Sequence, residues 1–234
     1  IEYAREIYTK AKNLENIEVK GISTHIGSQI LDLKPFEKAY KKIRELLLVL
    51  RADGFNIERI DLGGGLGIAY HNNENSPSIE EFSTVSGNIF KDMDVKLIIE
   101  PGRSLVGDAG ILITKVIYKK TSGSKIFVIV DAAMNDLMRH SLYDAYHEII
   151  PVTQKNENNK KITADIVGPV CESSDIFAIS REIDNIENNE LLAIMTAGAY
   201  GASMSSCYNT RLLVPEVMVK ANQFEIIRRR PSYT

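Results

Sequence analysis

The sequence has 234 residues, of which 44% are hydrophobic and 25% are charged, and its net charge is −3. This balance argues against a nucleic-acid-binding protein, which usually carries a strongly basic face, and no apolar stretch approaches the ~18 residues that cross a membrane. The two cysteines, Cys171 and Cys207, are too few for a disulfide framework, so a reducing cytoplasm is the expected location.

Helices and strands alternate through the first hundred residues. The predicted helices cover residues 2–13, 35–52 and 78–91, and the predicted strands cover residues 19–25, 57–62 and 95–99. Helices between successive strands imply a parallel sheet with right-handed crossovers. We therefore expect residues 1–106 to form the C-terminal part of a (β/α)8 barrel, with only three of its strands present.

After Gly107 the pattern indicates a mostly β domain, sandwich-like or barrel-like, over residues 107–234. Its predicted strands cover residues 111–119, 125–130, 162–167, 176–179, 191–195, 211–220 and 222–229. One helix is expected at about 135–149, with Met138, Leu142, Ala145 and Ile149 along its buried side. The polar stretch 155–161 is expected to be a hairpin or a loop. The predicted fold class is thus α/β followed by β.

Polar or glycine-rich segments follow all three strands of the first domain. These segments are His25–Ser28, Gly63–Gly67 and Glu100–Arg103. The carboxyl ends of barrel strands form the active face, and exposed backbone N–H groups in glycine-rich turns can hold a phosphate ester. A flexible strand exit is the alternative for the glycines alone. No second His or Cys lies near His25 at metal-ligand spacing, so no metal site is predicted.

Three further segments carry polar side chains in the second domain. Arg139 and Tyr143 lie four residues apart on the predicted helix and could together hold a carboxylate, although a solvated surface pair is the alternative. Cys171 could deliver a proton and the adjacent Glu172 could bind an amine, although a free Cys is more often inert packing. Tyr200, in a glycine-flanked turn, could close a phosphate pocket or belong to an ordinary turn.

Taken in this order, the segments resemble the diaminopimelate decarboxylases. The resemblance is carried by His25-Ile26-Gly27-Ser28-Gln29, Asp61–Gly67, Glu100-Pro101-Gly102-Arg103, Met138-Arg139 with Leu142–His147, Gly168–Ser173 and Gly198-Ala199-Tyr200. It covers the whole chain. It implies an alanine-racemase-like barrel followed by a β domain, with pyridoxal 5′-phosphate (PLP) as cofactor. The implied reaction converts meso-2,6-diaminopimelate to L-lysine and carbon dioxide, the last step of lysine biosynthesis.

The resemblance also implies a role for each matched residue. His25 stacks on the pyridine ring of the cofactor, and Glu100 faces the pyridine nitrogen and keeps it protonated. The phosphate is held by Ser28, Gly64, Gly65 and the Gly102-Arg103 turn, with Tyr200. The substrate is bound by Arg103, Arg139, Tyr143, Glu172 and Tyr200. Cys171 is the proton donor, and it reaches with Glu172 into the neighbouring subunit's site, so a homodimer with shared sites is implied.

The sequence departs from the family pattern at two places. His140 stands where the family usually has Pro, which leaves the Arg139–Tyr143 spacing intact. The family's cofactor-binding lysine lies in a segment resembling Tyr-x-x-Lys-Ala, and this sequence has no match for it. We therefore expect the first part of the barrel to lie upstream of Ile1, and we expect this chain to be inactive by itself.

Two other functions stay open at this point. One is a sister decarboxylase that acts on ornithine, arginine or carboxynorspermidine. Glu172 and the Arg139–Tyr143 pair favour instead a substrate whose distal end carries an amino-acid head group. The other is a non-catalytic homologue that binds a partner. The presence of Cys171, Arg103 and Arg139 argues against this alternative.

Overall fold

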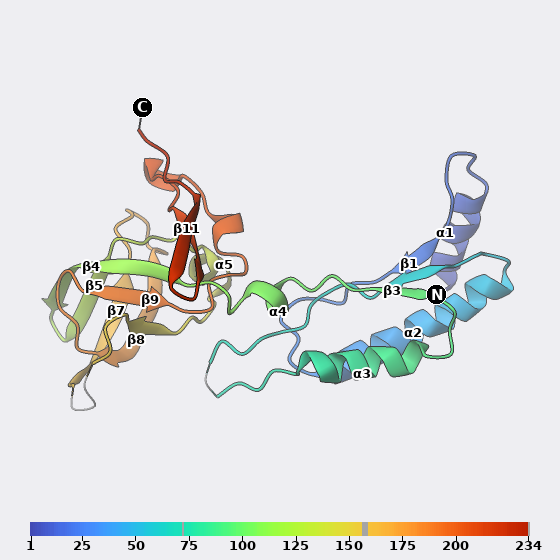
Figure 1. The fold of residues 1–234 in the computed structure, drawn as a ribbon, viewed down its shortest axis with the longest axis horizontal. Helices are drawn as coiled ribbons and strands as arrows, with labels where there is room; N and C mark the ends of the chain where they lie inside the picture. The colour runs from blue at the N-terminus through green and yellow to red at the C-terminus, as the bar shows by residue number, and fades with distance from the viewer. Residues whose placement is uncertain (72, 156–158, 234) are drawn as a thin grey trace. The chain divides into compact units, whose positions relative to one another are not determined.

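The computed structural model describes residues 1–71, 73–155 and 159–233. They divide into two compact units, Ile1–Leu105 and Val106–Thr234 (Figure 1). Part of the polar stretch 155–161, for which the sequence predicts a hairpin or a loop, lies outside the described residues. Within the described ranges, no helix is both long enough and apolar enough to cross a membrane.

The first unit is a three-stranded parallel sheet with helices between its strands. Its elements are α1 (Glu2–Lys12), β1 (Gly21–Ser23), α2 (Leu33–Ala52), β2 (Arg59–Asp61), α3 (Ile79–Phe90), β3 (Lys96–Ile98) and the short α4 (Arg103–Val106) that ends at the boundary. The strand order is β1-β2-β3, and Ile60 lies in register with Ile22 and Leu97. The α/β prediction for this part of the chain is confirmed.

Local sequence signals set the ends of the two long helices. The Asp32 side chain accepts the Lys34 backbone N–H over 3.0 Å at the start of α2, and Gly54, with φ +81°, follows its end. Ser78 and Glu81 form a capping box at the start of α3. The two helices pack side by side (Figure 1).

The core of the first unit lies between the sheet and the helices α2 and α3. The α2 side chains Phe36, Tyr40, Leu47 and Leu50 are fully buried, because they recur at helical spacing on the side that faces the strands. The Tyr40 hydroxyl donates to the carbonyl of Leu62 over 3.3 Å, and burial raises the pKa of Tyr40 to about 12. This contact supports the chain just where β2 turns into the glycine-rich segment.

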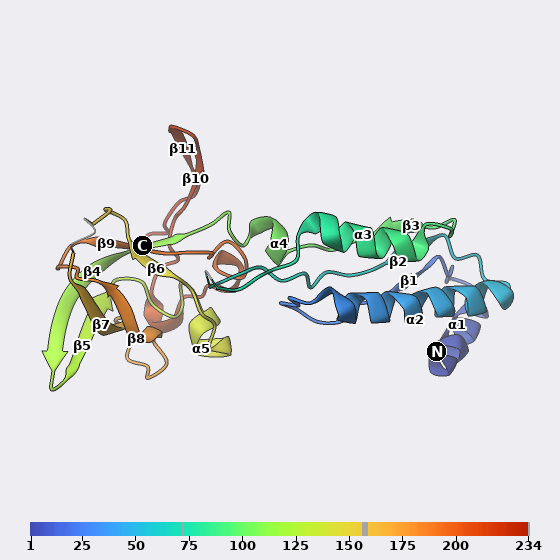
Figure 2. The ribbon, with the colours of Figure 1, turned by 90° about the horizontal axis from the view of Figure 1, so that it is seen from below.

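The second unit is built on a six-stranded sheet. Its strands are β4 (Leu112–Ser122), β5 (Lys125–Val130), β6 (Ile149–Pro151), β7 (Lys161–Val167), β8 (Ile176–Asp184) and β9 (Leu191–Ile194), in the order β6-β9-β4-β5-β7-β8. Among the strand pairs that the described residues form in this sheet, β5 and β7 alone run parallel. A separate hairpin of β10 (Glu216–Lys220) and β11 (Gln223–Arg228) projects from it (Figure 2). The mostly β prediction is confirmed.

The predicted helix at 135–149 is wrong in its bounds. The helix α5 covers only Arg139–Tyr143, because Asp144 adopts a left-handed conformation with φ 51° and ends it. Ile149 instead begins β6, which pairs with β9. Leu142, expected on the buried side, is 52% exposed. Pairing with a strand more than forty residues away prevails here over the local helical spacing.

Candidate functional site

The three strand ends of the first unit touch one another. The backbone N–H of Glu100 donates to the carbonyl of Gly63 over 2.8 Å, and the backbone N–H of Gly64 donates to Nδ1 of His25 over 3.2 Å. Because β1, β2 and β3 are parallel, their carboxyl ends share one edge, and the segments after them meet there. The structure therefore brings His25, Gly64 and Glu100 together, as the sequence predicts.

Close packing at this edge depends on glycine, as Gly64 and Gly65 show. A Cβ on Gly64 would lie 2.3 Å from the backbone oxygen of Glu100. Gly65 has φ +100°, and a Cβ there would lie 2.1 Å from the backbone oxygen of Gly27. Both obstacles are backbone atoms, which cannot move aside as a flexible side chain could. The glycines thus allow the segments that follow the three strands to pack closely together.

Arg103 supplies the positive charge at the shared edge. Its Nη2 donates to the hydroxyl of Ser28 over 3.2 Å, and its Nη1 donates to the hydroxyl of Tyr70. The guanidinium also lies over the Tyr70 ring, 5.6 Å from the ring centroid. The sequence analysis did not identify Tyr70 as a site residue. Its position shortly after Gly67 is the only sequence feature that could have indicated this role. A guanidinium, a hydroxyl and glycine-rich backbone form a donor set that suits a phosphate.

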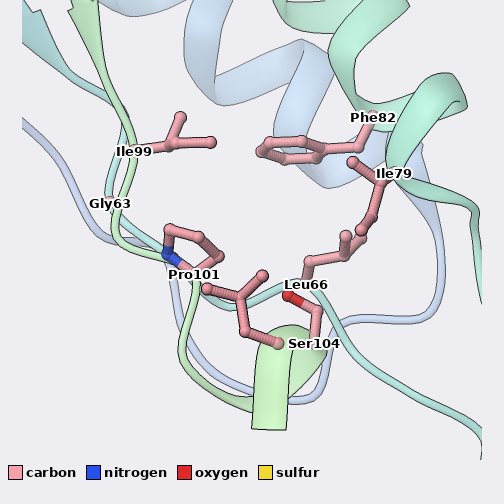
Figure 3. A pocket seen from close by; sticks show the side chains of 9 residues that line it. Gly63, Leu66, Ile79, Phe82, Ile99, Pro101 and Ser104 are labelled. Atoms are coloured by element: carbon pink, nitrogen blue, oxygen red, sulfur yellow. The ribbon is translucent and has the colours of Figure 1, made fainter.

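An apolar hollow lies next to this edge, with a volume of about 110 Å³. It is lined by Gly63, Gly64, Leu66, Ile79, Phe82, Ile99, Pro101, Ser104 and Leu105. Figure 3 shows Ile79 and Phe82, both from α3, across the hollow from Ile99 and Pro101. His25, Ser28 and Arg103 are not among the lining residues, whereas Gly64 of the candidate site is.

Arg139 lies in the second unit, at the start of α5, and is only 6% exposed. Its Nη1 lies 2.6 Å from Nε2 of His147, whose Nδ1 lies 2.8 Å from the carbonyl oxygen of Met195. Tyr143, four residues later, is 63% exposed, so the two members of the predicted pair have different surroundings. The sequence reading missed His147, although it belongs to the same Leu142–His147 segment.

His140, at the position where the family resemblance leads one to expect proline, is half-buried, with both of its ring nitrogens shielded from solvent. Its ring lies 4.9 Å from that of His147 and edge-on to Phe177 at 5.2 Å, as measured between ring centroids. Neither ring nitrogen has a hydrogen-bond partner of normal geometry among the described residues. Burial, followed by the nearby His147 and Arg139, lowers the pKa of His140 to about 3, although the Leu137 backbone acts in the opposite direction.

Cys171 and Glu172 are exposed in the turn before β8. Glu172 Oε2 accepts from the Tyr208 hydroxyl over 3.4 Å. Asp175 stabilises this turn. Its side chain is buried, with 3% exposure, and accepts hydrogen bonds from the backbone N–H groups of Val170 and Met134, each over 2.7 Å. Burial raises the pKa of Asp175, and these two N–H donors act in the opposite direction. The sequence offered no signal for Asp175 beyond its place at the start of a strand.

Tyr200 follows β9 and is 42% exposed, with φ 58°. The segment just before it is tied to the chain near the boundary, because Ala197 donates its N–H to Gly110 and Gly198 donates to Gly107, over 2.7 and 3.0 Å. Tyr200 is therefore presented on a fixed turn. Among the described residues, no cluster of three His, Cys, Asp or Glu side chains could hold a metal ion.

Comparison with known proteins finds relatives that belong to one class of decarboxylases. A family model described as "Pyridoxal-dependent decarboxylase, C-terminal sheet domain" matches residues 11–198. Diaminopimelate decarboxylase of Aquifex aeolicus is 47% identical over 233 residues, which cover 100% of this chain and 55% of the relative. The enzyme of that name from Zymomonas mobilis is 49% identical over 232 residues, covering 99% of this chain and 54% of the relative.

Solved structures agree with the sequence relatives. The crystal structure of diaminopimelate decarboxylase from Helicobacter pylori, complexed with L-lysine, has a TM-score of 0.92 at 38% identity and covers 99% of this chain and 57% of that one. This chain spans about half the length of the curated relatives it matches. The match extends through both units, so it includes the strand ends of the first and the sheet of the second.

Proposed function

This chain belongs to the pyridoxal-dependent decarboxylases, and on that basis we propose that it supplies cofactor- and substrate-binding residues of a diaminopimelate decarboxylase. The proposed reaction converts meso-2,6-diaminopimelate to L-lysine and carbon dioxide. The observation that carries it is the meeting of Ser28, Gly64 and Arg103 at one sheet edge, where the backbone of Glu100 also lies.

The residues at that edge fit PLP by their chemistry. Ser28, Arg103 and the backbone at Gly64, Gly65 and Gly102 would hold its phosphate, and Glu100 would hold a proton at the pyridine nitrogen. His25 is exposed beside Gly64 and would lie against the ring. When bound, PLP supplies an electron sink for the pair of electrons that the departing carboxylate leaves behind.

The second unit would add residues that bind the substrate and move a proton. Arg139 would hold substrate carboxylate by charge-assisted hydrogen bonds, as Arg103 of the first unit would, with Tyr143 and Tyr200 as hydroxyl partners. Glu172 would bind the distal ammonium group. Cys171 would donate the proton of its Sγ to the carbon that loses carbon dioxide, which completes the product. The exposure of Cys171 and Glu172 suits residues that act in the site of a partner subunit, and we therefore propose a homodimer.

Cys171 and Cys207 are both free thiols on the surface, which suits a reducing cytoplasm. The sister decarboxylase of ornithine, arginine or carboxynorspermidine is the competing activity. The relatives that cover nearly the whole chain at 47–49% identity carry the diaminopimelate name, which favours diaminopimelate as substrate.

A substrate panel tests the proposal. The natural protein that carries this chain is loaded with PLP and mixed in turn with meso-diaminopimelate, ornithine, arginine and carboxynorspermidine, and release of carbon dioxide is measured. We expect kcat/KM to be highest for diaminopimelate by at least a hundredfold, because a site that pairs both polar ends of its substrate rejects analogues that lack one. A preference for another amine, or no turnover of any of them, contradicts the proposal.

A further inference from the structure

The buried contact chain Arg139–His147–Met195 lies entirely within the second unit. His147 is fully buried, and both of its ring nitrogens have partners: Nε2 lies 2.6 Å from Nη1 of Arg139, and Nδ1 lies 2.8 Å from the carbonyl oxygen of Met195. The imidazole therefore connects the helix α5, which carries Arg139, to the end of β9.

These two partners fix the protonation state of the ring. A guanidinium can only donate, so Nε2 of His147 has to accept and carries no proton. A carbonyl oxygen can only accept, so Nδ1 has to donate and carries the proton. The contacts of His147 thus select a single neutral tautomer. A second ring proton would place two donors against each other at 2.6 Å.

We propose that His147 is a positioning residue for substrate binding, which holds the guanidinium of Arg139 through the lone pair of Nε2. This inference rests on the proposed function, in which Arg139 binds substrate carboxylate. Fixing the guanidinium before the substrate arrives reduces the side-chain entropy that binding would otherwise cost. His147 itself does not touch the substrate.

The residues around His147 hold its side chain and backbone in place. Arg181 of β8 donates from Nη1 to the backbone carbonyl of His147 over 3.0 Å and lies over the Tyr146 ring, 4.0 Å from its centroid. His140 packs against the imidazole from α5. The backbone and the ring of His147 are thus each held by separate neighbours, and little freedom remains at the Nε2 that faces Arg139.

Two substitutions separate the roles of the two ring nitrogens. In His147→Gln the side-chain oxygen reaches roughly the place of Nε2 and can still accept from Arg139, whereas in His147→Asn the amide nitrogen stands roughly at Nδ1 and can only donate to Met195. In the PLP-loaded natural protein, we expect KM for diaminopimelate to rise about tenfold in His147→Asn, with kcat changing less, and to stay within about threefold in His147→Gln.

The opposite order, with His147→Gln impaired and His147→Asn normal, would mean that the bond to Met195 matters and would overturn the proposal. Equal losses in both variants would also overturn it, because they indicate a purely structural role. Thermal unfolding of both variants shows whether each is folded under the assay conditions.

A second readout needs no catalysis. In a ¹⁵N–¹H spectrum of the unsubstituted protein, with His147 assigned from its absence in His147→Gln, we expect a protonated Nδ1 and an unprotonated Nε2. A protonated Nε2 refutes the proposal even if decarboxylation is observed. Conversely, the expected tautomer in a protein that turns over no substrate would leave the contact correct and the proposed function wrong, so the two failures are distinguishable.

Discussion

The carboxylate of Asp175 accepts the backbone N–H of Met134 over 2.7 Å, although 41 residues separate the two along the chain. Its other oxygen accepts the N–H of Val170, one residue before Cys171. The Ser141 hydroxyl adds a further link, since it donates to the carbonyl of Ser174 over 2.6 Å. Asp175 therefore connects the turn of the proposed proton donor to the segment that leads into α5.

Replacing this carboxylate should destabilise the second unit. In Asp175→Ala two backbone N–H groups lose their acceptors, and each unsatisfied group costs about 1–3 kcal/mol, so we expect the free energy of unfolding to fall by roughly 3 kcal/mol. Asp175→Asn retains one acceptor and should lose about half as much. Urea denaturation measures both. Asp108→Asn, at an exposed position, is the control, and an equal loss in all three variants would contradict this role.

Gly64 should not tolerate a side chain. The Cβ of Gly64→Ala would meet the Glu100 backbone oxygen at 2.3 Å, so the strand ends would have to separate. We expect PLP affinity to fall at least tenfold and the unfolding free energy to fall by about 1–3 kcal/mol. Fluorescence titration with PLP and thermal unfolding measure the two effects.

Gly87 provides a matched control for that substitution. It lies inside α3, and nothing lies within 4 Å of a Cβ placed on it. Gly87→Ala should therefore stabilise the protein by about 0.5–1 kcal/mol, because alanine is the better helix former, and leave PLP binding unchanged. Normal PLP affinity in Gly64→Ala would show that the close approach to Glu100 is unnecessary.

Much of the first unit could be predicted because its signals are local. Gly54 follows the end of α2, which lies at the predicted residue 52, and each strand end carries its polar residues within a few positions. The parallel arrangement then follows from the alternation of helices and strands, so the meeting of His25, Gly64 and Glu100 needed no knowledge of distant contacts.

The second unit was harder to predict because its decisive contacts are distant in sequence. His147 bonds to Met195, 48 residues away, and this contact together with the β6–β9 pairing replaces the helix that the spacing from Met138 to Ile149 suggests. Asp175 accepts a hydrogen bond from the backbone of Met134, although the strands β6 and β7 lie between the two residues in the sequence. The spacing of apolar residues predicts local helices and strands, but it does not predict which distant residues will be in contact.

Arg103 should control cofactor affinity more than its neighbours do. Arg103→Ala removes the charge and the hydrogen bonds to Ser28 and Tyr70, and a hydrogen bond to a charged group contributes about 1.5–3 kcal/mol. We expect the Kd for PLP to rise tenfold to a hundredfold, as measured by absorbance titration. Tyr70→Phe keeps the ring under the guanidinium and should change the Kd less than threefold. A larger increase of the Kd in Tyr70→Phe than in Arg103→Ala would contradict the proposal that the Arg103 guanidinium binds the phosphate of PLP.

His140 should make the protein less stable as the pH falls. Its pKa is about 3 in the folded chain and about 6.5 when unfolded. Between these values the unfolded chain binds a proton that the folded chain excludes, so the free energy of unfolding decreases by about 1 kcal/mol for each pH unit below 6.5 and this loss is complete near pH 3. Above pH 6.5 the residue contributes no pH dependence.

The apolar variant His140→Leu tests this slope. It removes the proton-binding group and two buried nitrogens without hydrogen-bond partners, so stability at pH 7 should be equal or higher, and the decline between pH 6.5 and pH 4 should become shallower by about 1 kcal/mol per unit. Urea denaturation at a series of pH values gives the slopes of the variant and of the unsubstituted protein. If His140→Leu keeps the slope of the unsubstituted protein, His140 takes up its proton in the folded state, and the neutral ring described above is incorrect.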